Sequence, residues 1–229
     1  MTVFKAIAFD YDGTLFDTRP AIIHCIARAF EESGRPKPAD DAVWQTVRSG
    51  IALQDAFLML DRDLRADHAA LQDRVRIYRT IYLDEGTGLL RPFAGAKDVL
   101  HELHGRGIKC LIVSNKGTAA IHRSLIENGL NSFIDWVLGD EPGLPRKPDP
   151  AMLTDHVLPR YPQFDRQNIL VVGDTEADIL FAQRSGTTCC WASYGYGEAG
   201  RCRALAPRHE ISSIAQLLPL IAASRTAAG

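Results

Sequence analysis

Short apolar runs alternate with amphipathic segments along most of the chain. The runs are too short for helices and are bounded by polar or turn residues, which is typical of buried strands; they cover residues 3–9, 108–113, 136–138, 169–172 and 187–191. Helical periodicity fills four of the segments between and beyond them, at residues 96–106, 118–128, 150–158 and 176–185. Buried strands alternating with helices predict an α/β fold, a three-layer Rossmann-like core with a parallel sheet.

The segment from residue 18 to residue 90 departs from this alternation. It contains no strand-like run, only helical periodicity; Ile22, Ile26 and Phe30, for example, fall on one helix face. Thr18 stands where this first helix would begin and is expected to be its N-cap. The segment therefore predicts an all-helical insertion after the first strand.

Two structural units follow from this pattern. We expect an α/β catalytic core formed by residues 1–17 and 91–229, and a helical cap formed by residues 18–90. Open α/β sheets bind ligands outside the carboxyl ends of their strands. A helical insertion that follows a strand's carboxyl end is therefore placed to act as a lid.

Composition narrows the range of functions. The 229 residues are 46% hydrophobic and 24% charged, with a formal net charge of −2, so neither nucleic acid polymers nor an anionic membrane surface is an expected partner. No apolar run reaches the roughly 18 residues needed to span a bilayer, and no export signal is recognisable, so we expect a cytoplasmic protein. The five cysteines lack metal-binding spacing and are expected to be reduced and structural.

The strongest chemical signal follows the first apolar run, where the chain reads Asp10-Tyr11-Asp12-Gly13-Thr14-Leu15. Asp and Gly are common in turns that close a strand, so a purely structural role is one reading. However, two carboxylates this close together at a buried strand end repel each other unless a cation holds them. The segment therefore favours a cation-dependent site.

The same segment resembles the D-x-D-G-T motif of the haloacid dehalogenase superfamily, and the resemblance spans nearly the whole chain. It implies that Asp10 is the nucleophile and that Asp12 is a general acid/base whose backbone carbonyl also binds magnesium. Gly13 and Thr14 are then expected beside the substrate. Family members that cleave carbon–halogen bonds lack the second aspartate, so Asp12 favours phosphoryl transfer over dehalogenation.

The second apolar run leads into Ser114, Asn115 and Lys116. A serine after a strand is commonly a helix cap. The resemblance implies instead that the Ser114 hydroxyl binds a phosphoryl oxygen, with Asn115 also contacting substrate. For Lys116, an ordinary surface lysine and a residue of the site both remain open.

A third matching segment contains Lys147 followed by Pro148. The resemblance implies that Lys147 reaches the same phosphoryl oxygens, because the family's third motif is a lysine often followed by proline. The alternatives are a solvated loop lysine, or the neighbouring Arg146 in its place.

The fourth segment follows the apolar run 169–172 and contains Asp174 and Asp178. Magnesium prefers oxygen ligands. We therefore expect Asp174 to bind Mg²⁺ directly, together with the Asp10 carboxylate and the Asp12 carbonyl. Two roles are open for Asp178. It can support the metal site, or it can form a capping box with Thr175 at the start of the next helix.

The helical insertion supplies candidates for substrate recognition. Arg48, Ser49 and Gly50 interrupt a helical pattern and resemble the family's substrate-specificity loop, and Arg19 is a further candidate. An arginine here could pair with a second anionic group of the substrate. A solvated arginine at a helix end is the alternative.

The resemblance implies a Mg²⁺-dependent phosphoric monoester hydrolase that acts through an aspartyl-phosphate. Relatives of similar length include phosphoglycolate phosphatases, nucleotidases and pyrophosphatases, and 2-phosphoglycolate is the leading substrate. The alternatives are a 5'-nucleotidase or pyrophosphatase, then a sugar-phosphate mutase, and last a catalytically silent binding protein. The expected partner is a small phosphorylated metabolite, and the expected state is a monomer or homodimer.

Overall fold

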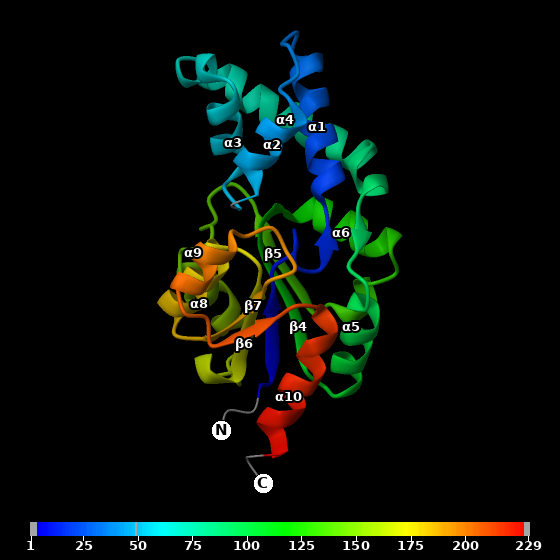
Figure 1. Ribbon diagram of the computed structural model, residues 1–229, viewed down its shortest axis with the longest axis vertical. Coiled ribbons are helices and arrows are strands. Elements are labelled where there is room, and N and C mark those ends of the chain that lie inside the picture. The colour runs from blue at the N-terminus through cyan, green and yellow to red at the C-terminus, as the bar shows by residue number, and fades with distance from the viewer. Residues whose placement is uncertain (1–3, 49, 227–229) are drawn as a thin grey trace.

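A six-stranded parallel sheet forms the centre of the computed structural model, which describes residues 4–48 and 50–226. Its strand order is β5-β4-β1-β6-β7-β8, so β1 lies inside the sheet between β4 and β6. The strands are β1 (Ala6–Phe9), β4 (Lys109–Gly117), β5 (Trp136–Asp140), β6 (Ile169–Gly173), β7 (Thr188–Ala192) and β8 (His209–Ile211). The predicted parallel α/β sheet is confirmed (Figure 1).

Strand alternation separates the two faces of the sheet. In β1, Ile7 and Phe9 belong to the hydrophobic cluster on one face, whereas Ala6 and Ala8 belong to the cluster on the other. Helices cover both faces, which explains why the strands are apolar on both sides. They are α5 (Ala96–Gly105), α6 (Thr118–Glu127) and α10 (Leu217–Thr226) on the first face, and η4 (Met152–Val157), α7 (Leu158–Arg160), α8 (Glu176–Ser185) and α9 (Ala199–Ala204) on the second.

In three places the helices and strands of the structure differ from those predicted. The segment predicted as one helix, 150–158, contains a π-helical stretch, η4, before the short α7. The short strand β8 was not predicted, because His209–Ile211 carries no apolar run. The helix α10 was not predicted either; it continues past Ile221, and Leu217 and Ile221 are buried in the core.

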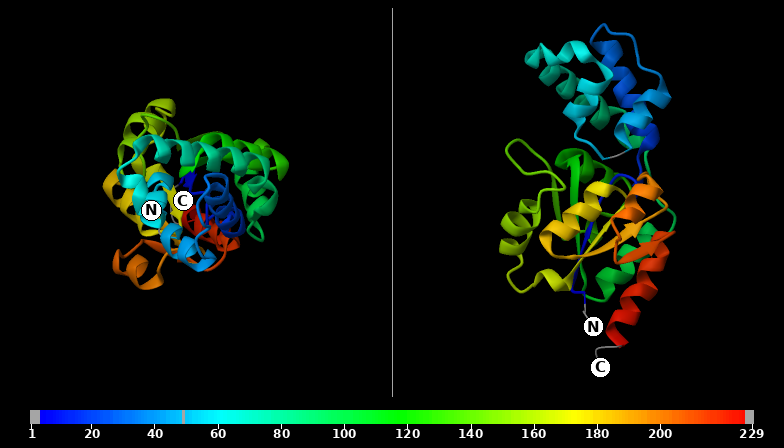
Figure 2. Two further views of the ribbon diagram at one scale, coloured as in Figure 1. Left: turned by 90° about the horizontal axis from the view of Figure 1, so that it is seen from above. Right: turned by 60° about the vertical axis from the view of Figure 1, so that its left-hand side comes forward.

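Four helices lie together beyond the carboxyl ends of the strands, at the opposite end of the molecule from both termini (Figures 1 and 2). They are α1 (Arg19–Glu32), α2 (Asp40–Val47), α3 (Leu53–Leu60) and α4 (His68–Asp84). The chain enters this helical group through β2 (Phe16–Asp17) and leaves it through β3 (Arg91–Pro92), and these two short strands pair antiparallel. The unit boundaries at residues 17/18 and 90/91 remain predictions.

The start of α1 differs from the prediction. Thr18 occupies the N-cap position but its side chain makes no capping hydrogen bond, because its backbone is helical (φ −107°, ψ −1°) rather than extended. The phenol oxygen of Tyr196 accepts instead from the amides of Thr18 and Arg19, at 2.7 and 3.0 Å. A loop of the core therefore caps the first helix of the insertion.

All five cysteines are buried free thiols, as expected. No helix among residues 4–48 and 50–226 has both the length and the hydropathy needed to cross a membrane.

Candidate active site

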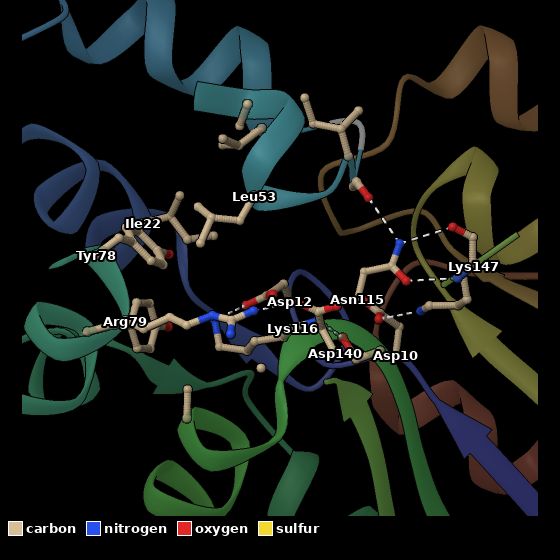
Figure 3. Close-up of a pocket in the computed structure, with 18 of the residues that line it drawn as sticks. Asp10, Asp12, Ile22, Leu53, Tyr78, Arg79, Asn115, Lys116, Asp140 and Lys147 are labelled. Carbon is tan, nitrogen blue, oxygen red and sulfur yellow. Dashed lines mark hydrogen bonds and ion pairs between the residues drawn. The ribbon is translucent and has the colours of Figure 1, made fainter. Parts of the chain in front are cut away.

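The sheet order brings the four motif segments together. Asp10 follows β1, Ser114 lies in β4 and Asp174 follows β6, and β4 and β6 are the two neighbours of β1. Because all three strands are parallel, their carboxyl ends meet at one edge. Lys147 comes from the loop after β5, the strand on the far side of β4. Four segments that are distant in sequence therefore converge at this edge, and Figure 3 shows side chains from three of them, among them Asp10, Asn115 and Lys147.

Buried carboxylates dominate this convergence point. Asp10, Asp174 and Asp178 each place an oxygen within 4.8 Å of one another. Lys147 donates to Asp10 Oδ1 and to Asp178 Oδ1, both at 2.5 Å. Two of the three carboxylates thus bind the same lysine, and the cluster has more acidic than basic groups. The carboxylates of residues 10 and 174 are close enough to bind one ion.

The pKa shifts of the carboxyl groups reflect their burial first and the excess of negative charge second. Burial raises the pKa of Asp10 to about 6, although Lys147 acts in the opposite direction. Burial and the neighbouring Asp10 and Asp178 raise the pKa of Asp174 well above its usual range. Burial disfavours the charged form of Lys147, but Asp10 and Asp178 outweigh it and raise the pKa of the lysine. A divalent cation would stabilise the ionised carboxylates.

Asp174 is held in a fixed orientation. The Thr14 hydroxyl donates to Asp174 Oδ1 at 2.9 Å, and the amide of Tyr196 donates to Oδ2 at 2.7 Å. Gly13 adopts a left-handed backbone (φ +78°), and a Cβ there would overlap Asp174 Oδ2. Gly13 and Thr14, two expected substrate contacts, are not among the described residues that line the cavity. The geometry links them to Asp174 instead.

Asp178 has the capping role that the sequence left open, and it also belongs to the carboxylate cluster. It forms the expected capping box with Thr175, whose amide and hydroxyl donate to Asp178 Oδ2 at 3.0 and 2.8 Å. Its other oxygen accepts from Lys147. Helix capping therefore fixes the carboxylate that, with Asp10, holds the lysine.

Asp12 lies apart from the three-carboxylate cluster. Its Oδ1 accepts from Lys116 Nζ at 2.9 Å, and the Lys116 side chain is only 7% exposed. The same ammonium lies 4.0 Å from the ring centroid of Tyr82 in α4, within cation–π range. Lys116 is therefore a residue of the site rather than a surface lysine. The available signal was its spacing from Ser114, since residues i and i+2 of a strand point to the same side.

Asn115, an expected substrate contact, makes three hydrogen bonds to backbone groups. Its side-chain oxygen accepts from the Lys147 amide at 2.8 Å, and its nitrogen donates to the carbonyls of Lys147 at 3.1 Å and Gly50 at 3.4 Å. It thereby joins the lysine loop to the segment between α2 and α3. Arg146, the alternative to Lys147, binds Asp140 Oδ1 at 2.6 Å instead of Asp10.

A cavity of about 370 Å³ lies above these residues, between the sheet and the helices. Asp10, Asp12, Ser114 and Lys147 line its floor, and Arg48 and Gly50 are among the residues of its other walls. Ser49, expected between them, lies outside the described residues.

Arg19 does not lie among the described lining residues of this cavity, so its expected substrate contact is not supported. Its guanidinium stacks on the Trp44 ring at 4.5 Å instead.

The arrangement has the parts needed for nucleophilic attack on an anionic substrate. Asp10 supplies a buried carboxylate at the cavity floor, with a lysine in contact. Asp12 supplies a second carboxyl group in the same cavity, outside the cluster that would hold a cation. Such a separation of carboxyl groups allows one to act as nucleophile and another as acid or base.

Comparison with known proteins agrees with this geometry. Residues 7–192 match the family model of the haloacid dehalogenase-like hydrolases. A phosphoglycolate phosphatase of Vibrio parahaemolyticus is 30% identical over 96% of this chain and 97% of its own. One of Neisseria gonorrhoeae is 31% identical over 85% of this chain and 82% of its own. A haloacid dehalogenase-like family hydrolase of Streptococcus pneumoniae superposes with a TM-score of 0.81 and 27% identity, over 96% of this chain and 99% of its own.

The motif resemblance is therefore confirmed over most of the chain, and so is the predicted enzyme class of phosphoric monoester hydrolase. The residues that the motifs indicated are those that the fold brings to one edge of the sheet. The chain belongs to the haloacid dehalogenase-like hydrolase family and is a phosphatase within it.

Proposed function

We propose that the protein is a Mg²⁺-dependent phosphatase that hydrolyses a small phosphomonoester through an aspartyl-phosphate on Asp10. One observation carries the proposal. Asp10 is buried at the end of the central strand, in contact with Lys147 and within 4.8 Å of carboxylate oxygens of Asp174 and Asp178. A carboxylate attacks a phosphate dianion only where the charge of the phosphoryl group is neutralised.

Asp10, Asp174 and Asp178 are the side chains that would contribute to Mg²⁺ binding, with the Asp12 carbonyl as a further proposed ligand. The donor set fits the ion, because Mg²⁺ prefers hard oxygen ligands and three carboxylates leave an excess of negative charge beside one lysine. When bound, the ion neutralises phosphoryl charge and orients the phosphoryl group.

The side chains divide the reaction between them. The Asp10 carboxylate attacks phosphorus while the bond from phosphorus to the leaving-group oxygen breaks, and Asp12 gives that oxygen its proton. Asp12 then takes a proton from water as the water attacks phosphorus, which releases inorganic phosphate and restores Asp10. Lys147 and the Ser114 hydroxyl bind phosphoryl oxygens in both steps. Splitting the reaction replaces one difficult displacement with two easier ones.

The names of the relatives suggest 2-phosphoglycolate as the first substrate to test, with Arg48 as the partner of its carboxylate. Nucleoside monophosphates and pyrophosphate are the next candidates. We further propose that helices α1–α4 form a cap domain over the site. The protein would act in the cytoplasm on a small metabolite, as a monomer or homodimer, without nucleic acid or membrane.

The test is release of inorganic phosphate from a panel of small phosphoesters, with Mg²⁺ and with a chelator. We expect turnover that stops on chelation and returns with added Mg²⁺. Asp10→Asn should abolish turnover and leave the far-UV circular dichroism unchanged. Glu141→Gln, a change to an exposed acid on the cavity rim, is the matched control. Turnover by Asp10→Asn at the rate of the control would refute the nucleophile, and chelator-insensitive turnover would refute the metal site.

A further inference from the structure

The two sides of the cavity, one formed by the core and one by the helices, differ in polarity. Its floor is polar, whereas its roof is built from side chains of all four helices above it and is mainly apolar (Figure 3). The half-buried or nearly buried apolar residues of this roof are Ile22, Val47, Ile51, Leu53, Tyr78 and Leu83. In Figure 3, Ile22, Leu53 and Tyr78 lie close together on the helical side of the cavity, away from Asp10 and Lys147. We call these six residues the apolar roof.

Most cations that line the cavity already have acidic partners. Lys147 contacts Asp10 and Asp178, and Lys116 contacts Asp12. Arg79 of α4 donates to Asp140 Oδ2 at 2.7 Å, which ties the helices to the core.

Arg48 is the one lining cation without a carboxylate at ion-pair distance among the described residues. Arg48 can therefore pair with one further anionic group of a substrate, but the six residues of the apolar roof offer no charge. Burying an ionised group without a partner is strongly unfavourable, so the part of the substrate that lies on the roof is expected to be uncharged.

The cavity is also large for a two-carbon leaving group. Its volume of 370 Å³ corresponds to about twelve water molecules at the liquid's share of volume per molecule. Glycolate would leave most of the apolar roof in contact with water. An apolar body that covers the roof removes that surface from water, which is favourable in proportion to its area.

We propose that the preferred substrate is a phosphomonoester whose leaving group carries an uncharged apolar or aromatic body larger than the two carbon atoms of glycolate. This inference rests on the proposed function, and it ranks such esters above 2-phosphoglycolate. The phosphoryl group binds at Asp10 and Lys147, and the apolar body lies against the apolar roof.

A series of straight-chain alkyl phosphates, from ethyl to octyl, tests the proposal through phosphate release. Each methylene that becomes buried should raise kcat/KM by about two- to fourfold. We expect hexyl phosphate to exceed both ethyl phosphate and 2-phosphoglycolate by at least about tenfold, since four further methylenes become buried. A phenyl and a naphthyl phosphate extend the series to aromatic bodies.

Paired variants locate the effect on the roof. Leu53→Asn should reduce the hexyl-to-ethyl ratio of kcat/KM, and Leu83→Asn provides a second test on another helix. Met59→Asn is the matched control, because Met59 lies on the same helix as Leu53, is 59% exposed and does not line the cavity among the described residues. Its hexyl-to-ethyl ratio should equal that of the unmodified protein.

The outcomes separate the two proposals. A flat alkyl series, or 2-phosphoglycolate as the best substrate, overturns the apolar-substrate inference and leaves the phosphatase proposal intact. A hexyl-to-ethyl ratio that Leu53→Asn and Leu83→Asn leave unchanged also overturns it. Absence of phosphate release from every ester overturns the proposed function together with the inference that rests on it.

Discussion

Two buried cations, one in the core and one in the helical insertion, have opposite surroundings. Lys147 in the core is 7% exposed and lies within a cluster of three carboxylates. Arg74 in α4 is 4% exposed, pairs with Asp61 at 3.4 Å, and lies over the Phe30 ring. The core cluster has more acids than bases, whereas the group around Asp61 is balanced, since Arg35 binds both Asp61 and Asp63.

This difference in charge balance distinguishes a ligand-binding site from an ion pair that only stabilises the fold. Buried charge is tolerated where it is paired, so a balanced group such as Arg74 with Asp61 needs no further partner. Burial raises the pKa values of Asp10 and Asp174, the neighbouring acids add to the shift, and such a group gains stability from an added cation. Burial is common to both cations, so the charge balance around them indicates where a ligand belongs.

The largest expected effect is the loss of activity on replacing Lys147, the buried cation of the core. Lys147→Met should lower kcat/KM for phosphate release by about 1000-fold or more, because it removes a positive charge directed at the reacting phosphoryl group. The protein should still fold, and urea unfolding measured on the same samples checks this. Activity within tenfold of the unmodified protein would show that Lys147 serves the fold rather than the reaction.

The next largest expected effect is the loss of stability on replacing Arg74, the buried cation of the insertion. Arg74→Met should reduce the free energy of unfolding by about 3 kcal/mol, because Asp61 loses its buried partner. Arg35 still binds Asp61, which limits the loss. Activity per folded molecule should stay within about threefold, as expected for a stability mechanism distant from the reacting atoms. A stable but inactive variant would contradict the distinction between the two cations.

The cluster's charge imbalance predicts a stabilising effect of metal. At about 100 times its dissociation constant, Mg²⁺ should add roughly 2.7 kcal/mol to the free energy of unfolding. The melting temperature should then rise by about 5–10 °C for a chain of this size. Asp174→Asn should lose most of this shift. Asp135→Asn, which changes an acid paired with Lys109 at the other end of the sheet, should keep it. Equal shifts in the two variants would place the metal elsewhere.

These contrasts also show what the sequence alone can predict. Asp10, Ser114 and Asp174 could be predicted because each follows an apolar run and stands in a segment that resembles one of the family's motifs. Parallel strands bring those positions to one edge. Their convergence is thus confirmed, and their roles in the reaction stay predictions.

The contacts of the insertion are harder to predict from its sequence. Ile22, Ile26 and Phe30 fall on the same predicted helix face, yet Ile22 and Ile26 line the cavity whereas Phe30 packs against Phe57. Periodicity identifies an apolar face but not which turn of it borders a cavity. Tyr196 is similar, since its capping of α1 is a contact across nearly 180 residues that no local signal contains. Long-range contacts of this kind require the folded structure.

The smallest expected effect concerns Lys116, which touches both regions. It holds the Asp12 carboxylate and lies against Tyr82 of α4, so Lys116→Met should leave the proposed acid without its positioning partner. We expect kcat/KM for an alkyl phosphate to fall about tenfold, less than the roughly hundredfold or more that loss of general acid catalysis costs, because Asp12 itself remains. Lys116→Arg should recover part of this loss, because it retains the charge.

The comparison of two leaving groups tests whether this loss arises through Asp12. An alkoxide requires a proton as it departs, whereas p-nitrophenolate departs without one, so p-nitrophenyl phosphate bypasses the acid. Lys116→Met should therefore lower activity on p-nitrophenyl phosphate by about twofold at most, against about tenfold on the alkyl ester. If the lysine served only to join the core to α4, both substrates would lose the same factor. Equal losses would therefore remove Lys116 from the chemistry and assign it to the packing of the helices against the core.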